Sequence, residues 1–307
     1  MIDFFNFITP DFNSYLTGPL FFLSLAALGF VIGILAGIFG VGGGFLLVPL
    51  MNILLGIPIE LAAGSATCYI IGTSTTGVIK HFNRGNIEIK AAVYISFGSM
   101  LGAVSGDILQ DSIVMLAGGN RFLFEQIMQG VFILLLLVIA WVISRESGYD
   151  EKSDIHPVTF LQKLRLGPDT DLFRSEQIGV SIIGLFGIGF SGGILTGFMG
   201  VSGGVLFMPI LVLGVGLAPH LAVGTSLAVV LVGSISAVIK KGLSGSGKVS
   251  LPIAVALLAA GAVGVRIGIV ISHKLHGEGL KKYFSIIVLG AAVMVAVKLF
   301  VSIGLFQ

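Results

Sequence analysis

The sequence predicts an all-α integral membrane protein made of two inverted repeats, each with about five hydrophobic segments. Of its 307 residues, 55% are hydrophobic and only 10% are charged, with a mean hydropathy of +1.07. A soluble domain carries roughly 25% charged residues, so this chain cannot cover a water-facing surface. Its apolar residues form runs long enough for membrane helices, and the second half of the chain repeats the first.

The apolar segments come in two sets of five. A helix that crosses roughly 30 Å of hydrocarbon needs about 20 residues, which most segments approach. The second segment of each set would extend only about 20 Å at about 1.5 Å per residue. The expected segments are Pro19–Phe39, Gly43–Leu55, Leu61–Ile79, Ala91–Leu109 and Ile127–Ile143, then Ile178–Met199, Gly203–Gly216, Leu221–Ile239, Leu251–Ser272 and Phe284–Leu299.

The chain therefore divides into three parts. Residues 1–144 form a first membrane repeat, residues 145–177 a charged cytoplasmic linker, and residues 178–307 a second membrane repeat. Within the linker, the short stretch 160–166 is amphipathic, with apolar and basic side chains, which is typical of a helix lying at the membrane interface.

An internal repeat supports this division. The block Gly33–Gly44 matches the block Gly193–Gly204 without a gap. The second block therefore lies 160 residues after the first, since 193 − 33 is 160. The same offset pairs Pro49 with Pro209, Gly56 with Gly216, Gly64 with Gly224, Ser74 with Ser234 and Lys80 with Lys240, and after a slip of two residues Gly102 and Gly106 pair with Gly264 and Gly268. We interpret this repeat as a duplication.

The number of crossings per repeat decides their relative orientation. Each repeat crosses the membrane five times if the short segment spans it, or three times if the first two segments form a hairpin that dips in and returns. Both numbers are odd, so the second repeat should be inserted upside down. A parallel arrangement with four crossings per repeat explains the distribution of Lys and Arg equally well, and both place the linker in the cytoplasm.

The paired glycine breaks, Gly40–Gly44 and Gly200–Gly204, are the strongest chemical signal. Such glycine density disfavours a helix interior, and non-helical backbone in a membrane must be buried or line a wet cavity. Each break precedes a short helix, whose free N–H groups and positive dipole end would point at the break. Two inverted copies would aim these ends at one midplane site suited to an anion. The alternative to an anion site is that the glycines only allow tight packing between helices.

Hydroxyl side chains add a polar lining to the two long helices that follow the breaks. They donate hydrogen bonds to anionic oxygens without a fixed charge, so release stays easy. Bonding within or between helices is the alternative. These side chains are Ser65, Thr67, Thr73, Ser74, Thr75 and Thr76 in the first repeat and Thr225, Ser226, Ser234 and Ser236 in the second.

Two ionisable residues within apolar segments are further candidates. Arg266 lies between Gly264 and Gly268 in an apolar segment, where a charge is costly and is a functional hypothesis by default. It is only about seven residues, roughly 10 Å, from the segment end, so its side chain could instead extend to the membrane interface. Asp107 occupies the comparable end of its own segment.

The doubled glycine block, with Pro49 and Pro209 and the Gly64-Ser65 and Gly224-Thr225-Ser226 steps, resembles the TauE/SafE sulfite exporter family, also called TSUP. The resemblance covers most of the chain outside the linker. It implies a secondary transporter in the cytoplasmic membrane for sulfite, thiosulfate, sulfonates such as sulfoacetate, or related organic anions. A carboxylate carrier or an anion channel is the alternative, and protons and sodium are the candidate coupling ions.

The predicted substrate site combines the breaks, the hydroxyl steps and the intramembrane arginine. Its residues are Gly42, Gly43, Gly44, Ser65, Ser202, Gly203, Gly204, Thr225, Ser226 and Arg266. The expected partners are a small anion and the lipid bilayer. We expect no cofactor, metal or nucleic acid, because one cysteine and five scattered histidines suit no thiolate-rich metal cluster and the charge of +2 gives no basic footprint.

An intramembrane serine protease is the competing class. Gly189-Phe190-Ser191-Gly192 resembles the nucleophile motif of the rhomboid proteases. A serine nucleophile needs an adjacent base. The five histidines all fall in predicted loops or at segment ends, so we expect no enzyme activity.

Overall fold

The computed structural model describes residues 18–116, 121–145, 169–171, 179–243, 249–272 and 277–304. Within these ranges the regular secondary structure is helical apart from one short strand pair, which confirms the predicted all-α class. The helices are α1 (Pro19–Phe39), α2 (Gly44–Leu54), α3 (Ile59–Phe82), α4 (Ile89–Leu116), α5 (Arg121–Arg145), α7 (Ile182–Met199), α8 (Gly204–Pro209), η1 (Ile210–Val215), α9 (Pro219–Leu243), α10 (Leu251–Ser272) and α11 (Gly277–Gly304).

The predicted segments correspond to these helices. The bounds of α1 and α10 agree with the prediction, while α4 and α11 extend several residues beyond it. β1 (Asp169–Asp171), in the linker, pairs antiparallel with β2 (Gly179–Ser181), which lies just after the linker and before α7. The sequence did not indicate this pair, because three residues are too few for an alternating pattern. The predicted amphipathic stretch 160–166 lies outside the described residues.

Seven of the described helices are long and apolar enough to cross a membrane: Pro19–Phe39, Ile89–Leu116, Leu123–Ala140, Ile182–Met199, Pro219–Lys241, Leu251–Ser272 and Tyr283–Phe300. Their lengths of 18 to 28 residues match the roughly 30 Å of a bilayer core. The hydroxyl-rich α3 has 24 residues but is less apolar. The chain is therefore a multi-pass membrane protein.

Glycines hold two pairs of helices in close contact. A β-carbon at Gly29, Gly33 or Gly37 of α1 would lie 2.3–2.4 Å from carbonyl oxygens of α10, at Leu257, Gly261 and Val265 respectively. The residue numbers rise together along both helices, so α1 and α10 run parallel. Gly98, Gly102 and Gly106 of α4 meet Phe186, Phe190 and Ile194 of α7 in the same way. Small residues allow such close backbone approach where lipid supplies no hydrophobic drive.

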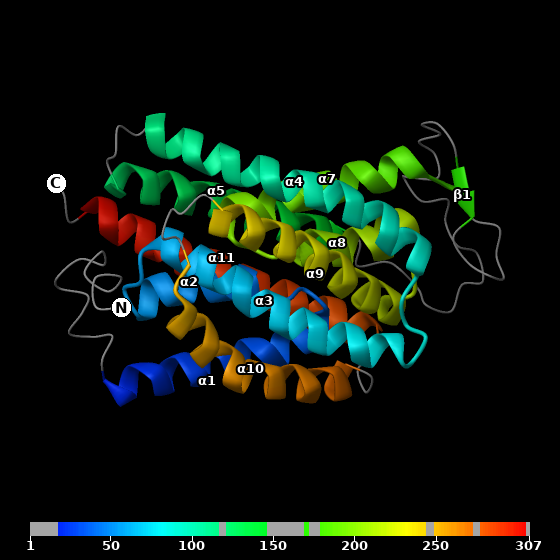
Figure 1. Ribbon diagram of the computed structural model, residues 1–307, viewed down its shortest axis with the longest axis horizontal. Helices are drawn as coiled ribbons and strands as arrows, with labels where there is room; N and C mark the ends of the chain where they lie inside the picture. The colour runs from blue at the N-terminus through cyan, green and yellow to red at the C-terminus, as the bar shows by residue number, and fades with distance from the viewer. Residues whose placement is uncertain are drawn as a thin grey trace.

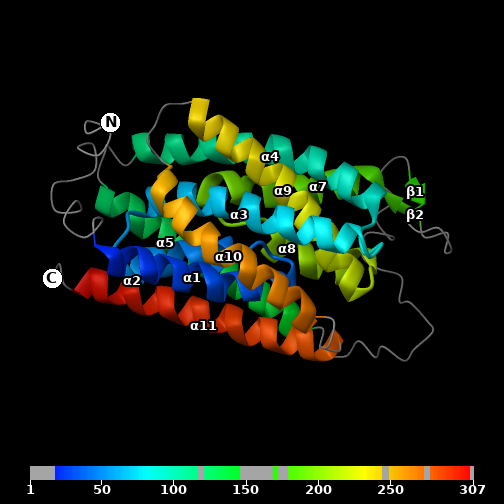
Figure 2. The same ribbon diagram turned by 60° about the horizontal axis from the view of Figure 1, so that its bottom comes forward.

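The helix contacts keep their pattern when the two halves are exchanged. α1 packs on α10 as α7 packs on α4, while α3 packs on α9 and α5 packs on α11. Figure 1 shows α1 and α10 together at the bottom of the view and α4 and α7 together at the top. There α7 begins beside β1, at the end of the bundle opposite to the start of α1. Figure 2 keeps α1 beside α10 and α4 beside α7.

The short second segments differ between the halves. The first is the 11-residue helix α2, which contains Pro49. The second, predicted as one short helix over Gly203–Gly216, is six residues of α-helix followed by the π-helix η1. Pro209 ends the α-helical part, because its ring removes a backbone donor and crowds the preceding turn.

Candidate functional site: two glycine breaks at the centre of the bundle

The first break is made of left-handed backbone. Gly40 ends α1 with φ of 70°, and its N–H donates to the carbonyl of Ala36 at 2.9 Å. Gly42 and Gly43 follow with φ of 70° and 85°, and Gly43 caps the start of α2. Glycine adopts this region without the cost that a β-carbon brings. The glycines of the first break therefore supply the left-handed backbone that separates α1 from α2.

The second break is held by a side chain. Gly200 has φ of 64° and its N–H donates to the carbonyl of Thr196 at 3.1 Å. The N–H of Gly203 donates to the Thr196 hydroxyl at 3.0 Å, and the backbone of Gly203 is right-handed. Sequence reasoning missed Thr196. The signal was present, because threonine stands there in place of Ala36 of the first repeat.

The two breaks touch each other. The Ser202 hydroxyl donates a hydrogen bond to the carbonyl of Val41. A β-carbon at Gly44 would lie 2.9 Å from the Gly200 carbonyl oxygen, and one at Gly204 would lie 2.8 Å from the Val41 α-carbon. Residues 40–44 and 200–204 are all buried. The structure thus brings together the predicted residues Gly42, Gly43, Gly44, Ser202, Gly203 and Gly204.

Each break also rests on the long helix of the other half. A β-carbon at Gly40 would lie 2.8 Å from Val223 of α9, and one at Gly200 would lie 2.3 Å from the carbonyl of Ala63 in α3. The predicted Ser226 donates to the carbonyl of Gly40 at 2.7 Å. α3 and α9 run antiparallel here, because Gly77 meets Leu227 while His81 meets Gly224.

Two of the predicted hydroxyls at the starts of α3 and α9, Ser65 and Thr225, bind the backbone before other helices rather than face the breaks. Ser65 accepts from the N–H of Ser250 at 3.1 Å, just before α10. Thr225 accepts from the N–H of Glu88 at 3.0 Å, just before α4. These equivalent bonds cap the following helices, because each satisfies an N–H donor near a helix start.

Two further hydroxyls at equivalent positions are buried without a hydrogen-bond partner among the described residues, Ser74 on α3 and Ser234 on α9. Each lies one helical turn beyond a residue that covers the breaks. A β-carbon at Gly44 would meet Ile70 at 2.5 Å, and one at Gly204 would meet Val230 at 2.9 Å. Residues four apart share a helix face, so both hydroxyls lie on the faces that cover the breaks.

Most other predicted lining hydroxyls are already satisfied within their own helices. Thr67, Thr75, Thr76 and Ser236 each donate to the carbonyl four residues earlier, at 2.7–3.0 Å. These four hydroxyls therefore bond within their own helices, which was the alternative to a substrate lining. Thr73 lies between these cases, because its hydroxyl bonds both its own helix and the carbonyl of Gly42 at 3.4 Å.

The structure does not bring Arg266 to the breaks. Its side chain is exposed on the outer face of α10, and its carbonyl accepts from the Lys80 ammonium at 3.0 Å. The inner face of α10 is occupied by Gly264 and Gly268, which pack against α1. Asp107, by contrast, is fully buried on α4.

The serine of the protease-like motif lies on the outer surface. Ser191 is exposed on α7 and donates to the carbonyl of Gly187 in its own helix at 2.8 Å. This bond to the preceding turn is the ordinary one for serine in a helix. Ser191 is accordingly placed on the opposite side of α7 from Thr196, which faces the second break.

A groove of about 380 Å³ lies between α3, α4 and α9. Its walls are apolar and include Phe82, Phe97, Met100 and Val232. Apart from Ser96, the lining side chains provide no hydrogen-bond donors for an anion, and the apolar walls suit contact with lipid chains. The glycine breaks and the hydroxyls above them therefore remain the candidate site.

Comparison with known proteins agrees with this architecture. A family model described as sulfite exporter TauE/SafE matches residues 25–295. A probable membrane transporter protein of Methanocaldococcus jannaschii is 24% identical over 290 residues, covering 89% of this chain and 93% of its own. The probable membrane transporter protein YunE of Bacillus subtilis is 23% identical over 275 residues, covering 87% and 94%.

A protein named sulfite exporter TauE/SafE family protein 5 in Arabidopsis thaliana is 31% identical over 87 residues, 28% of this chain and 19% of its own. No solved structure matches the chain at a significant level. The family is one of transporters rather than enzymes, and its model spans both glycine breaks. The chain belongs to the sulfite exporter TauE/SafE family of membrane transporters.

Proposed function

We propose that the protein is a secondary transporter of small sulfur-containing or organic anions, with sulfite, thiosulfate and sulfonates such as sulfoacetate as its substrate class. The family supports a small substrate and a membrane location. The single observation that carries the anion site is the pair of equivalent, buried and unpartnered hydroxyls, Ser74 and Ser234, above the two touching breaks. Buried polar groups are normally bonded, so a transient partner is the simplest reason for both.

The chemistry of the breaks favours an anion over a cation. Residues 40–44 and 200–204 contain no acidic side chain. The first N–H groups of α2 lack partners inside their helix, and the positive end of the helix dipole lies at Gly43. Two hydroxyl donors and these N–H groups would surround a sulfonate or sulfite oxygen without a permanent counter-charge, which keeps release easy.

Two inverted repeats, residues 1–144 and 178–307, would explain how such a site opens to each side in turn. The exchangeable helix contacts and the opposite directions of α1 and α7 support this arrangement. In the packed state described here, Ser202 bonds Val41 across the breaks. Anion binding then requires the two breaks to separate, and rocking of one half against the other would supply that motion.

We further propose the cytoplasmic membrane as the location, with the linker 145–177 on the cytoplasmic side. The concentration of Lys and Arg in the linker supports this orientation.

Ser74→Ala and Ser234→Ala test the site, with Ser236→Ala as the matched control, because its hydroxyl already bonds the carbonyl of Val232 at 3.0 Å. The readout is thiosulfate-induced thermal stabilisation of the purified protein, since a bound ligand raises apparent stability. A hydrogen bond to a charged group contributes about 1.5–3 kcal/mol, so each test variant should bind thiosulfate at least about tenfold more weakly. Neither should lose stability without the anion, because an unpaired hydroxyl is being removed.

The control variant should bind thiosulfate as the wild type does. Unchanged affinity in both Ser74→Ala and Ser234→Ala would remove these hydroxyls from the site. An unliganded stability loss without an affinity change would assign them to packing.

A further inference from the structure

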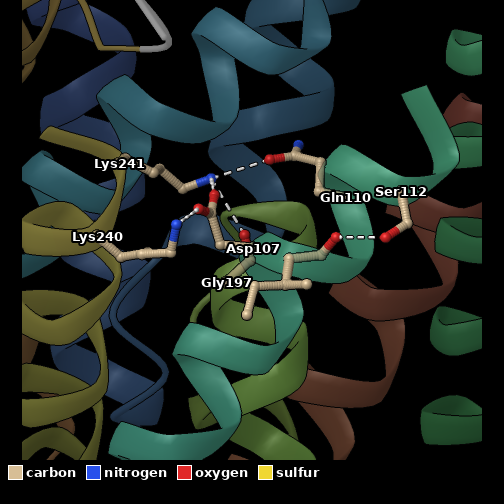
Figure 3. A network of polar contacts seen from close by, with 7 residues as sticks. Asp107, Gln110, Ser112, Gly197, Lys240 and Lys241 are labelled. Carbon is tan, nitrogen blue, oxygen red and sulfur yellow. Dashed lines mark hydrogen bonds and ion pairs between the residues drawn. The ribbon is translucent and has the colours of Figure 1, made fainter. Parts of the chain in front are cut away.

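A buried ion pair lies beside the second break. The Lys241 ammonium on α9 stands 3.2 Å from the Asp107 carboxylate on α4, and neither side chain has any exposed surface. Figure 3 shows the two side chains pointing toward each other from their separate helices, with Gly197 of α7 next to them. Three helices, from both halves of the chain, therefore meet at one buried charge pair.

Lys241 also holds the helix that leads into the second break. Its ammonium donates to the Gly197 carbonyl at 3.1 Å and to the Gln110 side-chain oxygen at 3.1 Å (Figure 3). An ammonium group has three donors, so it can bind Asp107, Gln110 and Gly197 together. Gly197 lies three residues before Gly200, about 5 Å along the helix axis. Lys241 thus connects the carboxylate of α4 to the backbone of α7 one turn before the second break.

The charge of Lys241 needs compensation where it lies. An ammonium buried in a membrane protein is costly unless a negative charge stands beside it, and removing one partner of such a pair leaves the other uncompensated. Lys240 is the other described cation facing Asp107, at 3.9 Å, but its side chain is 32% exposed and so remains partly hydrated. Within the part of the chain that the structure describes, the buried negative charge beside Lys241 is therefore that of Asp107.

Few other titratable groups of the described helices lie around the pair. α7 carries none in its sequence, and on α4 the next acid is Asp111, one turn beyond Asp107 and partly buried. On α5, Glu125 acts electrostatically on Lys298 of α11. Among the described residues, Asp107 is the acid placed to exchange its charge for that of an anion at the second break.

The scaffold does not require this pair. At the equivalent positions of the other half stand His81 in place of Lys241 and Ile269 in place of Asp107. Both halves nevertheless pack their helices in the same pattern. A pair needed only to hold the helices together would be expected in both halves, so its presence in one points to a role in transport.

We propose that Asp107 is the proton-binding site that couples proton movement to anion transport. When an anion binds at the second break, Asp107 takes up one proton from water, and the anion supplies the negative charge that Lys241 requires. When the proton leaves, the carboxylate recovers Lys241 and the anion is released. One anion and one proton then bind and leave together. This inference rests on the proposed function.

The test compares wild type with Asp107→Asn, Lys241→Gln and the double variant, all as purified full-length protein. Ser112→Ala is the control, because Ser112 lies on the same helix and bonds only the carbonyl of Ile108 in the described structure. Thiosulfate is the probe, since its charge is constant from mildly acidic to mildly alkaline buffer. At pH values where Asp107 is ionised before the anion binds, binding takes up one proton. The affinity for thiosulfate should then fall by up to about tenfold for each unit by which the pH is raised.

We expect this pH dependence in wild type and in Ser112→Ala. Asp107→Asn should bind thiosulfate with an affinity that does not change with pH. Lys241→Gln and the double variant should bind at least about tenfold more weakly at every pH. The double variant strands no charge, so it keeps the test valid if a single variant fails to fold. A double variant that binds as wild type, with the pH dependence retained, would overturn the proposal.

A second measurement does not depend on the anion. Infrared difference spectra between acidic and alkaline buffer should contain a protonated-carboxyl band that is present in wild type and absent in Asp107→Asn. If that band appears while thiosulfate and the other sulfur anions fail to bind wild type, the proton site stands and the proposed substrate class is wrong. If no such band appears, Asp107 is not a proton-binding site, whatever the anion does.

Discussion

Gly200→Ala tests whether the second break depends on close contact with the long helix of the other half. Two costs add at this position. The first is the left-handed backbone, at φ of 64°, which penalises a side chain by about 1–2 kcal/mol. The second is collision, since the new β-carbon would lie 2.3 Å from the Ala63 carbonyl oxygen and 2.5 Å from its α-carbon. Overpacking of this kind costs about 1–3 kcal/mol.

Gly56→Ala is the matched control. Gly56 has nearly the same backbone angle, φ of 66°, and nothing lies within 4 Å of its absent β-carbon. The control should therefore lose only the backbone term, about 1–2 kcal/mol, whereas Gly200→Ala should lose about 2–5 kcal/mol.

Reversible unfolding in mixed detergent micelles measures the difference between these two variants. Failure of Gly200→Ala to accumulate in membranes, with Gly56→Ala accumulating normally, is the extreme form of the predicted order. Equal losses at the two glycines would refute the reasoning, because the contact between the break and α3 would then contribute nothing.

Three further predictions concern topology, packing and the exposed arginine. In a background without the native cysteine, cysteines placed at Arg84 and at Lys248 should react with an impermeant thiol reagent from opposite sides of the membrane, and same-side labelling would reject the inverted repeats. Gly193→Ala puts a β-carbon 2.3 Å from a carbonyl oxygen of α4 and should destabilise by about 1–3 kcal/mol, whereas Gly187→Ala on the same helix meets nothing within 4 Å and should be neutral or stabilising in the same unfolding assay. Arg266→Gln should leave thiosulfate-induced stabilisation within about twofold of wild type, because the side chain faces outward, and a tenfold loss would return it to the site.

The helices could be predicted because hydropathy and length act locally. α1 and α10 begin and end where their apolar runs do, and the breaks fall where four glycines in five residues, or three in the second half, disfavour a helix. The repeat offset alone also pairs Ser74 with Ser234. These features depend on residues that are neighbours in sequence or that recur at one fixed spacing.

The contacts between distant segments could not be predicted in the same way. Asp107 and Lys241 are more than 130 residues apart, and no pattern in either segment indicates the other. In the sequence Thr196 is a single hydroxyl residue in a glycine-rich segment. Its role becomes visible only from the hydrogen bond that it accepts from the N–H of Gly203. The π-helical winding after Pro209 depends on how the turn relaxes around the proline rather than on hydropathy.

The orientation of Arg266 was open to a simpler argument. Gly264 and Gly268, which the repeat singles out, mark the packed face of α10. Arg266 is two residues from each, about 200° around the helix, so the packed face and the arginine cannot coincide. The spacing of the two glycines therefore predicts an outward-facing arginine.

The most direct test of the central claim is counterflow of labelled thiosulfate in proteoliposomes loaded with unlabelled thiosulfate. A secondary transporter with one central anion site should accumulate the label transiently above the level of protein-free vesicles. Sulfite and sulfoacetate added outside should compete with the label. Label uptake no greater than in protein-free vesicles, found with thiosulfate, sulfite, sulfoacetate and acetate alike, would contradict the account.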